Sequence, residues 1–89
     1  MFGFFMDKGQ KQIGVISNYF AHVGAAAIKL GGSLKVGEKI RIVGGGVDFE
    51  ESVKGIQINH KEVNAAKKGD EVGVMVKEKV KRGYKVFKV

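Results

Sequence analysis

The stretches LKVGEKIRIV (Leu34–Val43) and AKKGDEVGVMV (Ala66–Val76) follow one pattern, in which a glycine and an acidic residue precede alternating apolar residues. Glycine reaches the positive φ that many tight turns need. Alternation with a period of two sends one set of side chains toward a core and the other toward water. Each stretch is therefore predicted to be a turn that leads into a half-buried strand.

The rest of the chain extends this pattern. A bulge is expected near Gly55, a single helical turn over Glu62–Lys68, and a loose loop at Gly44–Gly46. About six short strands at roughly ten-residue spacing predict an all-β fold, and a small closed six-stranded barrel is favoured because closure removes exposed edges. The predicted strands are Gln12–Phe20, Ala25–Leu30, Lys39–Val43, Phe49–His60, Glu71–Lys79 and Tyr84–Val89.

The length of 89 residues indicates one domain, predicted as a flexible segment over residues 1–11 and a barrel over residues 12–89. Two alternatives concern the start: Met6 is the true first residue, or Phe2, Phe4 and Phe5 contact a partner. The absence of cysteine excludes disulfides and zinc–thiolate sites. No apolar run approaches the ~20 residues that span a bilayer, so no membrane partner and a cytoplasmic location are expected.

The chain is basic, with a formal charge of +7 and a sequence pI of about 9.8. Its many lysines fit a thermophilic source and an anionic partner equally well. Residues 61–89 hold nine basic and four acidic residues, so the charge is concentrated there. Such a patch can follow a phosphate backbone, and Tyr84 could add a stacking surface; alternatively, the lysines only protect an edge strand. The candidate nucleic-acid-binding residues are Lys77, Lys79, Lys81, Arg82 and Lys85.

Residues suited to catalysis are sparse. His22 and His60 are far apart, and no serine follows a nucleophile pattern. Asp48, Glu50 and Glu51 match no calcium loop and are predicted to form a solvated acidic turn. In Gly32–Lys39 the nearest approach to a phosphate-binding loop has Glu38 in place of the lysine, and an acid there would repel phosphate. We therefore expect no enzyme activity, no nucleotide binding, no cofactor and no metal.

Several short motifs together resemble domain two of the EF-Tu type translational GTPases, in particular short stand-alone proteins that are elongation factor-like, and also the C-terminal domain of collagenase-like peptidases. The resemblance covers residues 12–89 and implies the barrel fold. One departure is the opening Gln12–Ile16, which lacks the glycine- and arginine-rich sequence associated with tRNA contact in true elongation factors. The motifs are Ile13-Gly14-x-x-x-x-Tyr19-Phe20, Asp48-Phe49, Gln57-Ile58-x-His60-Lys61 and Gly83-x-Lys85-Val86, alongside the two stretches quoted first.

Charge and resemblance together favour a non-catalytic binding module. The first hypothesis is an RNA or ribonucleoprotein adaptor with RNA or the ribosome as its partner. The alternative is a protein-interaction module that serves a separately encoded enzyme, as the similar domain does within collagenase-like peptidases.

Overall fold

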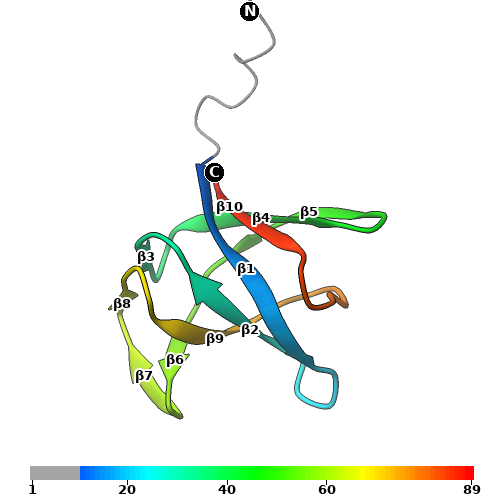
Figure 1. Cartoon of the computed structure of the whole chain (residues 1–89). Coiled ribbons are helices and arrows are strands. Elements are labelled where there is room, and N and C mark those ends of the chain that lie inside the picture. The colour runs from blue at the N-terminus through cyan, green and yellow to red at the C-terminus, as the bar shows by residue number, and fades with distance from the viewer. Residues whose placement is uncertain (1–10) are drawn as a thin grey trace, which may run out of the picture.

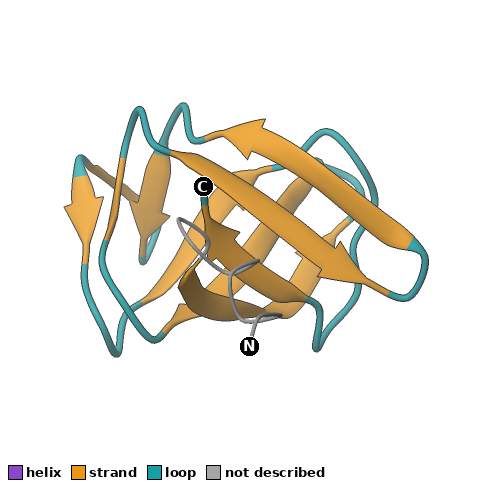
Figure 2. Ribbon diagram, turned by 90° about the horizontal axis from the view of Figure 1, so that it is seen from above, coloured by secondary structure: helices purple, strands orange, loops and turns teal. Residues whose placement is uncertain are grey.

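The computed structural model describes residues 11–89 and is all-β, with no helix in that range (Figures 1 and 2). Eight antiparallel strands form one sheet in the order β5-β4-β10-β1-β2-β9-β6-β7, and β3 pairs with β8 in a second. The strands are β1 (Lys11–Phe20), β2 (Ala25–Leu30), β3 (Leu34–Lys35), β4 (Lys39–Gly44), β5 (Val47–Ser52), β6 (Ile56–Ile58), β7 (Lys61–Val63), β8 (Ala65–Ala66), β9 (Glu71–Met75) and β10 (Lys85–Lys88). Apart from Lys11, the segment expected to be flexible lies outside the described residues, as do Phe2, Phe4 and Phe5.

The prediction of a closed six-stranded barrel is wrong. The larger sheet is open, and its edge strands β5 and β7 do not pair with each other. The reason lies in the predicted strand Phe49–His60, which is divided into β5 and β6 by residues 53–55 rather than bulged at Gly55. These two strands follow each other along the chain but lie at or near opposite edges of the sheet.

This division also makes the sheet curl. Ser52 and Ile56 are four residues apart, so at most about 15 Å of chain connects β5 to β6. In the sheet order β6 is six strand spacings away from β5. A flat sheet of that width would hold the two strands farther apart than the connection can reach. The sheet therefore wraps around its apolar face without hydrogen bonds that close the circle, as the view from above shows (Figure 2).

The two predicted turns are confirmed, and they have the same construction. Gly37 and Gly69 have φ values of +97° and +96°. In each turn the acid that follows the glycine, Glu38 or Asp70, accepts a side-chain hydrogen bond from the backbone N–H three residues earlier, at 2.8 and 3.0 Å respectively. The strands β4 and β9 begin directly after these acids.

The predicted helical turn over Glu62–Lys68 is wrong, because this segment forms β7 and β8. Leu34 pairs with Ala66 and Lys35 pairs with Ala65. A single helical turn gains little on its own, whereas Leu34 and Ala66 are both buried here. The long-range pairing therefore outweighs the local preference.

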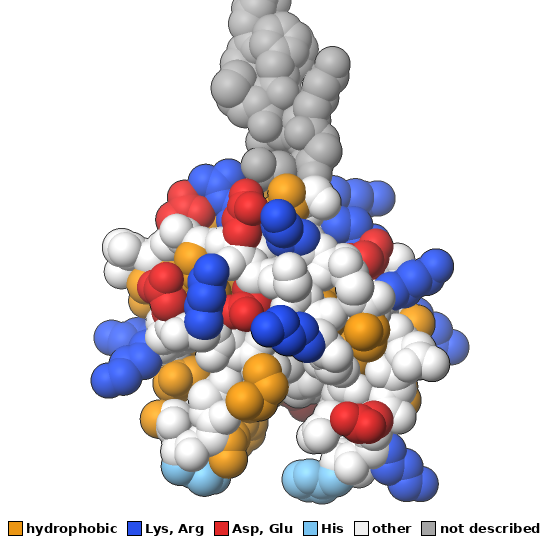
Figure 3. All heavy atoms as spheres, turned by 180° about the vertical axis from the view of Figure 1, so that it is seen from behind, with side chains coloured by type: hydrophobic (Ala, Val, Ile, Leu, Met, Phe, Trp, Pro, Cys, Tyr) orange, Lys and Arg blue, Asp and Glu red, His pale blue; other side chains and the backbone are white. Residues whose placement is uncertain are grey.

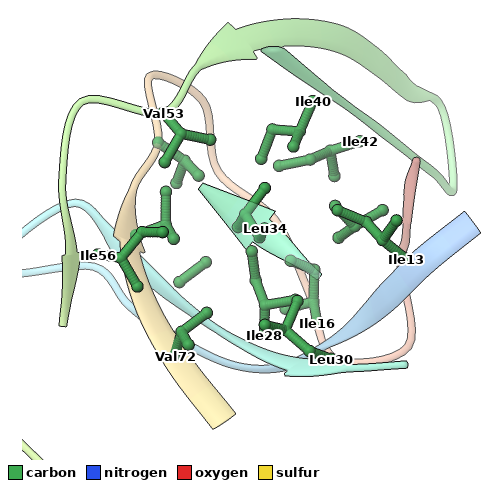
Figure 4. Packing of buried hydrophobic residues seen from close by; sticks show 14 of the residues in the cluster. Ile13, Ile16, Ile28, Leu30, Leu34, Ile40, Ile42, Val53, Ile56 and Val72 are labelled. Atoms are coloured by element: carbon green, nitrogen blue, oxygen red, sulfur yellow. The ribbon is translucent and has the colours of Figure 1, made fainter. Parts of the chain in front are cut away.

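The core lies inside the curled sheet and is formed by aliphatic side chains from most strands (Figure 4). Alternation is confirmed in β4, where Ile40 and Ile42 are fully buried, and in β9, where Val72 and Val74 are buried. No buried polar or charged residue occurs among residues 11–89. No helix of the described chain is long and apolar enough to cross a membrane.

Candidate binding surface

The segment between β9 and β10, residues 76–84, carries four of the five predicted cations, and we call it the basic loop. It was expected to be strand up to Lys79, but β9 ends at Met75. The sequence VKEKVK alternates as a strand would, yet no neighbouring strand pairs with it. Lys77, Lys79 and Lys81 therefore do not share a strand face, which corrects the predicted arrangement.

Hydrogen bonds to three different places hold this loop. The N–H of Val76 donates to Gly24 O at 2.9 Å, and the N–H of Gly83 donates to Ile16 O at 2.8 Å. Glu51 of β5 accepts the N–H of Lys77 at 2.7 Å. The loop therefore connects the β1–β2 turn, β1 and the edge strand β5.

Apolar side chains anchor the same loop. Val76 is 8% exposed and Val80 is 3% exposed, and both belong to the core. Lys79 and Lys81 flank Val80 and are exposed. An inward valine between two lysines leaves both lysine side chains directed away from the core.

All five predicted cations are exposed. Lys85 begins β10, and Arg82 donates from Nε to Ser17 O at 3.1 Å. The ion pairs found in residues 11–89 are Lys39–Glu50, Arg41–Asp48 and Lys88–Glu38, so none of them involves the five. The structure thus brings the predicted cations onto one fixed loop and the adjoining strand end.

Tyr84 is used by the fold itself. It is partly buried against the core, and a Cβ built on Gly44 would overlap its ring. One ring face is therefore covered by the β4–β5 hairpin, so the residue is less suited to base stacking than predicted. The same ring lies against Gly44 and Gly45, whereas a Cβ built on Gly46 would meet nothing within 4 Å.

The predicted acidic turn is instead part of β5. Asp48 receives Arg41 Nε at 2.7 Å and Arg41 Nη2 at 2.5 Å. This hydrogen-bonded contact lowers the pKa of the Asp48 carboxyl and raises the pKa of Arg41. Glu50 lies 3.9 Å from Lys39. These carboxylates are engaged by neighbouring groups on β4 and the basic loop.

Residues with possible catalytic chemistry do not assemble into a known site. Ser17 Oγ donates to Glu71 Oε2 at 2.5 Å. Neither histidine side chain forms a hydrogen bond in the described part of the chain, and residues 11–89 contain no group of three His, Cys, Asp or Glu residues able to hold a metal. His60 lies in the β6–β7 turn with φ +67°, beside Asn59 with φ +53°.

Sequence reasoning missed a cluster of exposed apolar side chains beside the basic loop. Phe20, Val23 and Met75 are 41%, 51% and 62% exposed. They lie at the β1–β2 turn and the adjacent end of β9. We call these three residues the apolar tip. The only sequence signal was a phenylalanine and a methionine at strand ends, and the strand register was needed to bring them together.

The β1–β2 turn lies at the end of the molecule opposite the start of β1 and the C-terminus (Figure 1). Seen from behind, hydrophobic side chains gather on the lobe that holds the β1–β2 turn, and Lys or Arg side chains project near it (Figure 3). Apolar and basic groups therefore adjoin on this side of the molecule.

Comparisons with known proteins find similarity to parts of proteins that are described as proteases or peptidases. No protein-family model matches the chain. An uncharacterized protease of Methanocaldococcus jannaschii is 43% identical over 77 residues, which are 85% of this chain and 19% of that protein. This chain therefore spans about a fifth of its curated relative.

Solved structures agree on the fold. Two crystal structures of the C-terminal domain of a Geobacillus thermoleovorans protein described as a U32 peptidase match with TM-scores of 0.84 and 0.82. Both are 18% identical to this chain; they cover 89% and 85% of it, and the chain covers 92% and 96% of them. The matches support the peptidase-domain half of the predicted resemblance and not the translation-factor half.

Proposed function

We propose that this chain is a non-catalytic module that serves a protease-like protein. The observation that carries the proposal is the 43% identity to a 77-residue part of an uncharacterized protease that is several times longer. The fold shared with the C-terminal domain of a protein described as a U32 peptidase supports the same role. The matched part is small enough to be an accessory unit beside a larger body.

The groups that the module presents support a binding role rather than catalysis. A serine nucleophile is normally activated by an adjacent base such as histidine, whereas the Ser17 hydroxyl has the Glu71 carboxylate and Ala27 O as its acceptors in the described chain. The basic loop and the apolar tip present cations and apolar side chains, which suit molecular contact.

A domain exchange tests the proposal. The 77 matched residues of the Methanocaldococcus jannaschii protease would be deleted, replaced with the matching part of this chain, or replaced with an unrelated β domain of similar size. We expect the deletion to lower solubility and the unfolding temperature, and the replacement by this chain to restore both. A replacement that behaves like the unrelated domain would contradict the proposal.

A second measurement addresses catalysis directly. The purified chain would be incubated with fluorescently labelled casein and gelatin beside Ser17→Ala and Glu71→Gln variants. We expect no cleavage above buffer. Cleavage that disappears in either variant would reject a non-catalytic role.

A second candidate function, RNA binding, rests on one observation: five exposed cations occur on one fixed loop and the adjoining strand end without an ion pair in the described chain. Binding to a pool of ribosomal and transfer RNA would be titrated across salt, since phosphate contacts weaken linearly with the logarithm of salt concentration. Lys79→Glu/Lys81→Glu should abolish retention. Lys67→Glu/Lys68→Glu, with the same charge change on the β8–β9 turn, should reduce it less. Equal loss in the two variants would reject the assignment to the loop.

A further inference from the structure

We infer that the apolar tip is the centre of a docking surface for a protein segment that carries apolar side chains flanked by carboxylates. The inference rests on the proposed function, which requires a protein partner, and it adds where that partner docks and with what chemistry.

The strand register places two of the tip residues, Phe20 and Met75, on one face of the sheet. Phe20 is opposite Ala25 in the β1–β2 pair, and Ala25 is opposite Met75 in the β2–β9 pair. Residues directly opposite each other in a sheet point to the same side. Phe20 and Met75 therefore lie two strand spacings apart, about 10 Å. The small side chain of Ala25 lies between them and leaves a shallow apolar surface.

Local structure does not explain the apolar character of these positions. The β1–β2 turn is held by backbone bonds from Val23 and Gly24 to Phe20 O, at 3.2 and 2.9 Å, and by the positive φ of Gly24. Neither bond uses a side chain. The remaining large exposed apolar residues of residues 11–89 lie away from the β1–β2 turn: Val15 in the first half of β1, Val36 after β3 and Val89 after β10. Clustered exposed apolar groups mark contact sites, and Phe and Met are enriched in interface centres.

Charge complementarity identifies the occupant. The bond from Val76 N–H to Gly24 O joins the start of the basic loop to the tip, so Lys77 and Lys79 follow within three residues of it. The loop residues 77–82 contain four cations and one acid, Glu78. An interface with an apolar centre and a basic rim selects a partner with apolar side chains between carboxylates.

A displayed peptide library tests this chemistry without assuming a particular partner. Random 12-residue peptides on phage would be selected against the full chain, and a synthetic peptide of the selected consensus would be titrated by fluorescence polarisation. We expect Asp and Glu to be enriched on both sides of Phe, Leu or Trp. Affinity should fall at least about tenfold in Phe20→Ser/Met75→Ser, and it should weaken with salt and in Lys79→Glu/Lys81→Glu.

Matched controls separate docking from folding. Val36→Ser/Val89→Ser removes other exposed apolar groups elsewhere and should change affinity less than about twofold. Circular dichroism and urea unfolding would show that each variant is folded. Consensus peptides without acidic residues, or unchanged affinity in the tip variant, would overturn the inference. Self-association that the tip variant abolishes would also overturn it, because a second copy would then be the occupant. The inference would also be overturned if RNA displaced the peptide while the tip variant still bound the peptide with normal affinity.

The domain exchange separates this inference from the proposed function. If the exchanged protease is restored equally by the wild-type chain and by Phe20→Ser/Met75→Ser, the docking surface is wrong and the proposed function stands. If neither restores it while the peptide still binds through the tip, the proposed function is wrong and the docking surface stands.

Discussion

Replacing Gly44 with alanine should destabilise the protein because of one neighbour, Tyr84. A Cβ at residue 44 would overlap the Tyr84 ring. The ring has little freedom to retreat, since Tyr84 is packed against the core and its carbonyl accepts the N–H of Ile16 at 2.8 Å. Overpacking of this kind typically costs about 1–3 kcal/mol.

An opposing term must be subtracted. Alanine in a strand is favoured over glycine by roughly 0.5–1 kcal/mol, because glycine loses more backbone freedom on folding. The net loss of unfolding free energy is then about 1–2 kcal/mol. For a domain of this size that corresponds to a decrease in Tm of roughly 5–15 °C. Thermal and urea unfolding followed by circular dichroism would measure both quantities.

A double-mutant cycle isolates the cause. In a Tyr84→Ala background the overlap is absent, so Gly44→Ala should become neutral or stabilising by up to about 1 kcal/mol. The coupling energy should be about 2 kcal/mol, well above the ~0.5 kcal/mol expected for independent sites. Gly55→Ala, where a Cβ would meet nothing within 4 Å, is the control and should be neutral or slightly stabilising. The reasoning is refuted if Gly44→Ala destabilises both backgrounds equally.

Three other predictions concern the turn, the ion pair and the basic loop. His60→Gly should raise the unfolding free energy by about 1 kcal/mol, since a left-handed φ is costly for histidine; an unchanged urea midpoint would show that the turn is unstrained. The Asp48 carboxyl should titrate by NMR below its ordinary pKa of 3.8 and return to it in Arg41→Gln. Because that pKa is lowered in the folded state, any stabilisation is present above the ordinary value and is lost as pH falls through the lowered one. Val80→Ala should lower the free energy of unfolding by about 1–3 kcal/mol and speed amide exchange at Gly83. An unchanged exchange rate at Gly83 in the variant would contradict this prediction.

The parts of the fold that the sequence predicts are those encoded within a few residues. Each of the turns at Gly37 and Gly69 needs only a glycine two positions before the following strand and an acid one position before it. The local sequence is therefore enough to specify these turns. The division of β5 from β6 and the pairing of Ala66 with Leu34 depend on segments far away in the chain. No local pattern specifies those partners, so the closed barrel and the helical turn were predicted wrongly.

The same distinction holds for the candidate surface. The cations were found from composition, but their arrangement was mistaken because the alternation after Met75 resembles a strand. A strand requires a neighbouring strand to satisfy its backbone groups, and here the Glu51 carboxylate takes the N–H of Lys77 instead. The apolar tip was not predicted at all, since Phe20 and Met75 are 55 positions apart in the sequence and meet only through β2.

The basic loop is anchored to the core and also displays charge, and these roles use different atoms. Anchoring uses the side chains of Val76 and Val80, backbone hydrogen bonds, and the Arg82 contact to Ser17. The ammonium groups of Lys77, Lys79 and Lys81 take no part in an ion pair of the described chain, and like charges so close together repel each other. The fold therefore gains nothing evident from these three charges. If they served solubility alone, Lys67→Glu/Lys68→Glu and Lys79→Glu/Lys81→Glu would be equivalent in every binding assay. A difference between the two variants would locate a binding function on the loop without disturbing the residues that hold it in place.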